Sequence, residues 1–125
     1  VDESSPVMEE EIFGPILPII PFDAIDEALA FVKQRPKPLA LYLFSQDRET
    51  QKKVTSELSY GGGCINDVVM HLANVHLPFG GVGQSGQGSY HAKEGFLSFS
   101  HIKPILKSRT FLDVPLRYPP IRGGD

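Results

Sequence analysis

The apolar residues between Asp23 and Gln34 recur at spacings of three and four, which is the period of an α-helix. They fall on one helical face and comprise Ile25, Ala28, Leu29 and Val32. Asp23 stands where a capping side chain is favoured, and Pro36 stops the helix at its other end. The pattern therefore predicts an amphipathic helix over Asp23 to Gln34.

A continuous apolar run, Leu39 to Phe44, follows this helix. Such a run is typical of a strand that is buried on both faces of a parallel sheet. Asp47 then caps a polar helical segment that ends near Leu58, and the apolar segment Cys64 to Asn66 comes where the next strand is expected. The proline-edged segment Ile16 to Ile20 is a further strand candidate. Strands that alternate with helices predict an open α/β sheet.

After Asn66 the sequence shows no strong helix or strand pattern. The segment Asp67 to His76 fits either a loop or a short helical turn, and the glycines between Leu77 and Gly88 predict an irregular loop. Ala92 to Phe99 suits one or two helical turns, and His101 to Lys107 suits a strand weakened by Pro104. The last residues, Arg117 to Asp125, are expected to form an extended or mobile tail.

Composition excludes several classes of function. The 125 residues carry a formal net charge of −3, which offers no basic surface to nucleic acid or to an anionic membrane. The longest apolar run is far too short to span a bilayer. Cys64 is the one cysteine, so neither an internal disulfide framework nor a multi-cysteine zinc site can form. A soluble globular domain, or a part of one, remains.

The sequence offers few candidates for a catalytic, metal-binding or cofactor-binding site. Residues 81–86 match the pattern G-x-G-x-x-G but lack a clear strand before them and a helix after them, so a loop that wraps against another segment is favoured over a dinucleotide fingerprint. The four histidines have no metal-ligand spacing, and no metal site is expected. Cys64 lies in an expected strand, which favours a buried structural thiol over a nucleophile. Glu11 either belongs to a solvated acid run or is presented by a turn beside Phe13.

Several motifs, taken together in their order, resemble the aldehyde dehydrogenase superfamily. These are the Glu-Glu-Ile-Phe-Gly-Pro of residues 10–15, the apolar run at 38–44, the Gly-Gly-Cys-Ile-Asn-Asp-Val-Val of 62–69 and the glycine loop with its flanks at 77–91. That last stretch, with the Arg-Tyr-Pro-Pro of residues 117–120, resembles the class 3 or fatty-aldehyde branch. The resemblance runs from about Pro6 to Ile121.

The resemblance implies an NAD- or NADP-dependent enzyme that oxidises aldehydes to carboxylic acids through a cysteine thiohemiacetal and hydride transfer. It implies that residues 1–100 form the C-terminal part of an open parallel-sheet catalytic domain, and that residues 101–125 form an oligomerisation strand and an extended tail. In the family, the nucleophilic cysteine, the general base and the nucleotide-binding domain all precede the segment at residues 10–15. The chain is therefore expected to be a C-terminal fragment, with no catalytic residue of its own.

Site residues follow from the resemblance position by position. Glu11 matches the glutamate that hydrogen-bonds the nicotinamide ribose, and Phe13 matches the aromatic residue that packs beside the nicotinamide. Phe79 matches a residue of the aldehyde tunnel. The remaining pocket residues are Tyr90, His91, Val69, Leu72 and Ala73. The Cys64 thiol falls in a segment that does not supply the nucleophile.

The expected partners are an aldehyde, the remainder of the same protein and a second copy in a homodimer, with no nucleic acid. Since no membrane anchor follows Ile121, a soluble, cytoplasmic protein is expected. The alternative is a non-catalytic α/β interaction or oligomerisation module derived from this scaffold. The sequence leaves open which aldehyde is preferred and whether the cofactor is NAD or NADP.

Overall fold

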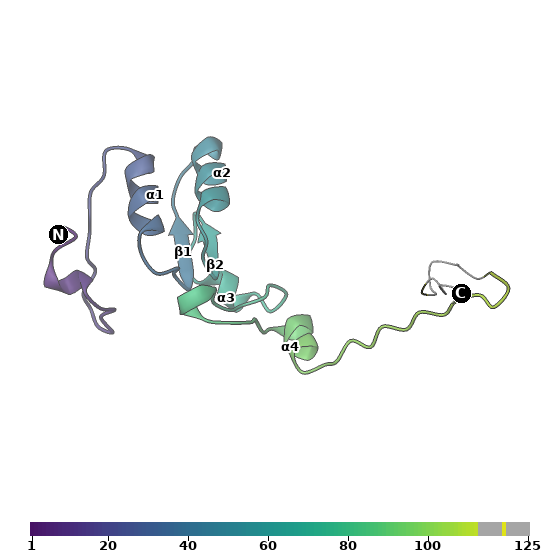
Figure 1. The fold of residues 1–125 in the computed structure, drawn as a ribbon. Helices are drawn as coiled ribbons and strands as arrows, with labels where there is room; N and C mark the ends of the chain where they lie inside the picture. Colours follow the sequence, from purple (N-terminus) through teal and green to yellow (C-terminus); the bar gives the residue numbers. More distant parts are fainter. Residues whose placement is uncertain (113–118, 120–125) are drawn as a thin grey trace, which may run out of the picture.

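A computed structural model describes residues 1–112 and 119. Its elements in chain order are η1 (Pro6–Met8), α1 (Ile25–Lys33), β1 (Ala40–Leu43), α2 (Arg48–Glu57), β2 (Gly62–Ile65), α3 (Met70–Ala73), η2 (Gly83–Ser85) and α4 (Ala92–Ser98). The two strands lie side by side with α1 and α2 standing next to them, and the chain after α4 extends away from this body (Figure 1). The ordered centre is thus one β–α–β unit with α1 packed on its helix.

The two strands are parallel. Ala40 pairs with Gly62 and Leu43 pairs with Ile65, and α2 makes the crossover between them. The predicted parallel α/β sheet is confirmed in this pair. Just past both strands, the Asn66 side chain accepts a hydrogen bond from the Ser45 amide at 2.8 Å and donates one to the Ser45 carbonyl at 2.9 Å. These two bonds continue the strand pairing beyond its last backbone contact.

The helix after Asp47 begins as the sequence predicts. One carboxylate oxygen of Asp47 accepts a hydrogen bond from the Thr50 amide at 2.8 Å, and the other accepts one from the Glu49 amide at 3.3 Å. These amides are among the donors that have no partner inside a helix. Contact with the Thr50 side chain, followed by the Thr50 and Glu49 amides, lowers the pKa of Asp47. The charged carboxylate is therefore the form that caps α2.

The predicted cap of the first helix is wrong. The helix α1 begins at Ile25, and its preceding residue Ala24 makes no side-chain cap. The Asp23 backbone amide instead donates a hydrogen bond to the Glu27 carboxylate at 3.2 Å. The side chain that accepts a hydrogen bond at the start of α1 is therefore that of Glu27, which lies within the helix. Glu27 is also favoured there by the positive end of the helix dipole.

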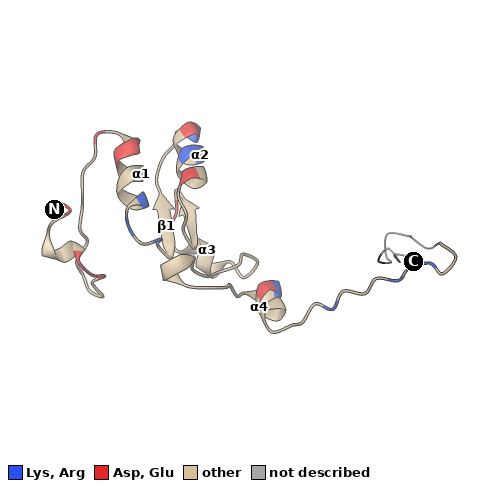
Figure 2. Ribbon diagram, viewed as in Figure 1, with Lys and Arg blue, Asp and Glu red and all other residues tan. Residues whose placement is uncertain are grey.

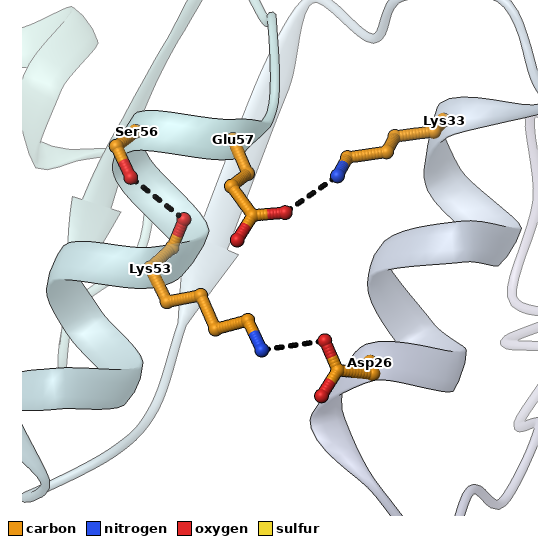
Figure 3. A network of polar contacts seen from close by, with 5 residues as sticks. All are labelled: Asp26, Lys33, Lys53, Ser56 and Glu57. Atoms are coloured by element: carbon orange, nitrogen blue, oxygen red, sulfur yellow. Dashed lines mark hydrogen bonds and ion pairs between the residues drawn. The ribbon is translucent and has the colours of Figure 1, made fainter.

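Two ion pairs join α1 to α2. Lys53 contacts Asp26, and Lys33 contacts Glu57, so each helix contributes one acid and one base (Figure 3). Hydrogen bonding to Asp26 raises the pKa of Lys53. Charged residues of both signs gather on α1 and α2, whereas the strands and α3 carry few (Figure 2). Because exposed ion pairs stabilise little, the helix pair depends more on its buried apolar side chains, Leu29 and Val54.

Two strand predictions differ from the structure, because the neighbouring strands that they need are absent from the described residues. The strand β1 is not buried on both faces, since its residue Tyr42 is 40% exposed. The segment Ile16 to Ile20 forms no strand. The strand predicted at His101 to Lys107 would pair with a neighbouring strand outside the described residues, so it stays a prediction. A strand exists only where another strand accepts and donates its backbone hydrogen bonds, and Pro18 and Pro104 each lack a donor. The predicted tail at Arg117 to Asp125 lies largely outside the described residues.

The chain exposes far more surface than a self-contained protein. Its accessible area is 10,900 Å², whereas a compact monomer of this mass exposes about 6,600 Å². Among the described residues, the buried hydrophobic side chains are those of Leu29 and Val54. A core of this size cannot offset the conformational entropy of the chain. The described residues therefore bury little apolar surface among themselves.

The Asp47 cap gives a first prediction. In the full-length protein, Asp47→Ala should lower the unfolding temperature at neutral pH, because two α2 amides lose their acceptor. Asp47→Asn retains an acceptor oxygen and should recover most of the loss. Since the folded-state pKa of Asp47 is lowered, its charge-dependent contribution is present at neutral pH and disappears as the pH falls below 3.8. Thermal unfolding of the three proteins at decreasing pH should show the wild-type and asparagine curves converging. Equal stability of wild type and alanine variant at neutral pH would contradict the capping role.

Candidate functional site

The centre of the candidate site is the Phe79 ring, which three other rings surround. Its centroid lies 5.7 Å from that of Tyr90, 6.0 Å from that of His91 and 5.8 Å from that of His71. Tyr90 and His91 also contact each other edge to face at 4.6 Å. The structure therefore brings together the three aromatic residues expected in the pocket wall, although they come from two ends of a loop.

Backbone bonds hold the two ends of this loop together. Phe79 and Tyr90 form an antiparallel bridge, with their amides and carbonyls exchanging hydrogen bonds of 3.0 and 2.9 Å. The His91 imidazole nitrogen Nδ1 lies 3.1 Å from the Leu77 carbonyl. Because a carbonyl only accepts, Nδ1 carries the proton in this contact, and neutral His91 keeps its lone pair on Nε2. The bridge between Phe79 and Tyr90 places the rings of these two residues on the same side of the loop.

The glycine loop packs against β1 and β2 as closely as backbone can. A Cβ atom on Gly61 would clash with the Gly80 carbonyl oxygen and would lie 2.6 Å from the Leu39 carbonyl oxygen. A Cβ atom on Gly81 would clash with the Ser85 backbone. The prediction of a closely wrapped loop is confirmed. The segment at 81–86 contains the three-residue η2 and is followed by no long helix, so it is not a dinucleotide fingerprint.

Two hollows flank this loop. One of about 440 Å³ is lined by Leu39, Phe79, Tyr90, Phe99 and the loop glycines. The other, of about 320 Å³, is lined by Glu11, Leu39, residues 36–38 of the preceding turn and Gln84 and Ser85 of the loop. Leu39 lines both. Glu11, expected at the cofactor, therefore lines one hollow, while Phe79 and Tyr90, expected at the aldehyde, line the other. His91, also expected at the aldehyde, lines neither of them.

Other expected site residues lie outside these hollows. The Phe13 ring is 94% exposed and lines neither of them. Val69, Leu72 and Ala73 sit at and within α3, and their side chains are exposed. The helix α3 adjoins the cluster through His71, whose ring contacts that of Phe79. These four residues are free to contact further protein or a ligand, and their roles stay predictions.

Sequence reasoning missed the pair formed by Cys64 and His71. The Cys64 sulfur lies 3.6 Å from Nδ1 of His71, and the thiol is half-buried rather than fully buried. The His71 side chain is 7% exposed, and its Nε2 atom has no hydrogen-bond partner. The backbone turns back between strand and helix through left-handed conformations at Asn66 and Val69. Asn66 is of a residue type that adopts this conformation more often than most, whereas the β-branched Val69 gives no sign of it.

Residues 1–112 and 119 contain no group of three or more histidine, cysteine or acidic side chains that could hold a metal ion. Over the same residues, no helix has the length and apolar character needed to cross a membrane.

Comparison with known proteins decides the family. The family model described as "Aldehyde dehydrogenase family" matches residues 1–105. This chain belongs to the aldehyde dehydrogenase family. It is 54% identical over 123 residues to the 4,4'-diaponeurosporen-aldehyde dehydrogenase of Staphylococcus aureus, covering 98% of this chain and 27% of that protein. It is 53% identical over 122 residues to aldehyde dehydrogenase family 3 member A2 of Mus musculus, covering 96% of this chain and 25% of the relative.

A solved structure agrees with the fold of this dehydrogenase chain. The substrate-bound state of Staphylococcus aureus AldH superposes with a TM-score of 0.85 at 56% identity, over 98% of this chain and 27% of that one. The predicted resemblance to the aldehyde dehydrogenases, including the class 3 branch, is confirmed. The chain spans about a quarter of the length of the curated relatives it matches.

The close approach at Gly61 gives a second prediction. In the full-length dehydrogenase, Gly61→Ala should destabilise the fold by roughly 1–3 kcal/mol, because the methyl group must displace backbone on both sides. Gly95→Ala is the matched control. Gly95 lies inside α4 with open space around it, so this change should be neutral or stabilising by about 0.5–1 kcal/mol. Denaturant unfolding would measure both, and equal effects would contradict the packing argument.

Proposed function

We propose that this chain is the C-terminal part of an NAD- or NADP-dependent aldehyde dehydrogenase of the class 3 branch. The whole protein oxidises an aldehyde, of the fatty-aldehyde type, to its carboxylic acid. This part of it supplies one contact to the cofactor and one wall of the aldehyde pocket. The observation that carries the proposal is the aromatic cluster around Phe79, which adjoins the hollow lined by Glu11 across a shared loop.

The exposed surface supports the fragment interpretation. Large apolar side chains stand in solvent over most of the chain, among them Phe13, Leu17, Phe96, Phe99 and Leu106. Exposed apolar area on this scale marks a surface that other protein covers. The remainder of the catalytic domain and the nucleotide-binding domain are the proposed cover. They also supply the nucleophilic cysteine and the general base, and Cys64 takes neither role.

The cofactor contact is proposed for Glu11 and Phe13. Glu11 offers an exposed carboxylate to a hollow that also contains Lys37, and a carboxylate accepts hydrogen bonds from both hydroxyls of a ribose. The exposed Phe13 ring has a face available to pack on an aromatic ring. These residues fit a nicotinamide ribonucleoside. When bound, the nicotinamide supplies hydride acceptance, and the two side chains hold it in position.

The pocket wall is proposed for Phe79, Tyr90 and His91, with Val69, Leu72 and Ala73 extending it. The stacked rings present an apolar surface against which an aldehyde chain can exclude water. Each ring is held by a neighbour and by the bridge between Phe79 and Tyr90, so the wall is formed before the substrate arrives. An apolar wall of this kind suits a hydrophobic aldehyde better than a charged one.

The remaining proposals concern assembly. Residues 1–100 are assigned to the catalytic domain, and residues 101–125 are assigned to an oligomerisation strand and tail that complete a cytoplasmic homodimer. Residues 101–107 are extended and exposed, which leaves their backbone groups available to a neighbouring strand. A non-catalytic interaction module would also expose apolar surface, so enzymatic assay must separate the two.

Aldehyde-dependent NAD(P)H formation provides that assay. The full-length protein should reduce NAD or NADP with a medium- or long-chain aldehyde, while the 125-residue chain alone should show no activity. A nucleophile and base act as one unit with the rest of the site, so their removal forfeits nearly all catalysis. Turnover by the isolated chain would overturn the fragment interpretation, and an inactive full-length protein would favour the interaction module.

Glu11 gives a prediction about the cofactor. Hydrogen bonds to a charged group contribute about 1.5–3 kcal/mol, so Glu11→Gln should slow hydride transfer by roughly 10- to 150-fold. The KM for the aldehyde should change little, because Glu11 and Phe79 line different hollows. Glu10→Gln, one residue away, is the matched control and should leave turnover unchanged. With deuterated aldehyde, the isotope effect on kcat should rise in the Glu11 variant alone. Identical isotope effects and cofactor affinities in both variants would make Glu11 part of a solvated acid run.

A further inference from the structure

The His71 ring is packed between the sheet and the aromatic cluster. His71 is 7% exposed, and its ring centroid lies 5.7 Å from that of Tyr42 and 5.8 Å from that of Phe79. The ring also lies against β2, where a Cβ atom on Gly62 would come within 2.9 Å of the ring carbon Cδ2. A ring with close neighbours on the strands and in the cluster has little room to move.

His71 differs from the other two rings that contact Phe79. Tyr90 is 54% exposed and His91 is half-buried, and both belong to the end of the glycine loop. His71 comes from α3 and is the buried residue of that helix. An exposed ring can turn into solvent, whereas a ring in close-packed surroundings keeps its position. His71 is therefore the fixed support among the three neighbours of the Phe79 ring.

His71 reaches the proposed aldehyde site only through Phe79. The Phe79 ring lines the hollow of about 440 Å³, whereas His71 contacts that ring without lining the hollow. The polar atoms of His71 have few partners among the described residues, since Nε2 is buried without a hydrogen bond and Nδ1 lies 3.6 Å from the Cys64 sulfur. What His71 contributes at this place is the volume and the rigidity of its ring.

We propose that His71 is a positioning residue that sets the width of the aldehyde pocket by supporting the Phe79 ring. The proposal rests on the proposed function, in which Phe79 forms a wall of that pocket. Removal of a buried ring leaves a space that its neighbours fill only in part. The Phe79 ring can then turn toward this space, and the hollow that it lines becomes wider. A wider pocket accepts a broader aldehyde, and kcat/KM measures that discrimination.

The test compares heptanal with cyclohexanecarbaldehyde, which has the same number of carbon atoms but is broader. The full-length protein is assayed with both, and the quantity of interest is kcat/KM for the broad aldehyde divided by kcat/KM for the narrow one. His71→Ala should raise this ratio roughly 10-fold, because small changes of fit in an apolar pocket have effects of this order. A loss of folded protein lowers both rates equally, so it leaves the ratio unchanged.

Two further variants identify the ring as the cause. His71→Phe keeps an aromatic ring of similar volume and should retain the wild-type ratio. His76→Ala is the matched control, since His76 is an exposed histidine in the turn after α3 and should leave the ratio unchanged. A wild-type ratio in His71→Ala would overturn the proposal, and so would a ratio in His71→Phe that is raised as much as in His71→Ala.

Gly62→Ala keeps the proposal testable if His71→Ala does not fold. The added methyl group needs space that the His71 ring occupies, so the ring is displaced from β2 toward Phe79 and the ratio should fall. An unchanged ratio in Gly62→Ala would then overturn the proposal. Phe79→Ala separates this result from the proposed function, because it should raise the ratio whether or not His71 supports the ring. An unchanged ratio in Phe79→Ala would contradict the pocket wall itself.

Discussion

The contact on which this structure depends is the approach of bare backbone at Gly61. Its Cα lies so close to the Leu39 and Gly80 carbonyl oxygens that no side chain could be accommodated. The Gly61 amide donates to the Pro38 carbonyl at 3.0 Å, directly before β1 and β2 begin to pair. One position thus joins the start of the sheet to the glycine loop. The loop carries Phe79 at one end and Tyr90 at the other, so the aromatic cluster takes its place from this contact.

The two hollows lie beside the same glycine loop. Leu39 lines both of them, and the loop forms a partition between the side that contains Glu11 and the side that contains Phe79. In an enzyme that transfers hydride, the cofactor and the substrate must meet at short range without exchanging places. Hydride transfer needs direct contact between the nicotinamide and the aldehyde carbon, so the loop can separate the rest of the two ligands but not their reacting atoms. Both hollows are open, and the proposed function assigns their remaining walls to the rest of the protein.

The sequence predicted correctly the elements that depend on interactions between residues close together in the chain. The Asp47 cap and α2 depend on neighbours within a few residues, and they form as predicted. The parallel pairing of β1 and β2 follows from the apolar run and the helical crossover. The family motifs also identified the residues that gather at the loop, although their roles in binding remain proposals.

Features that depend on distant or missing partners were not predictable in the same way. The cap of α1 fails because Glu27 reaches back to the Asp23 amide. The apolar run of β1 predicts burial that only a larger domain can provide, and the segment at His101 needs a neighbouring strand. The contact between Cys64 and His71 depends on a turn with left-handed backbone at Asn66 and at the β-branched Val69, and the sequence gives no signal for the second of these.

The most direct test of this account is a crystal structure of the full-length protein with the oxidised cofactor and an unreactive aldehyde analogue. The account predicts that the two Glu11 carboxylate oxygens lie within hydrogen-bond distance of the two hydroxyls of the nicotinamide ribose. We also predict that the Phe79 ring contacts the analogue beside the nicotinamide. A structure in which Glu11 faces solvent and Phe79 is packed away from the analogue would contradict the assignment of this chain to the cofactor and aldehyde sites.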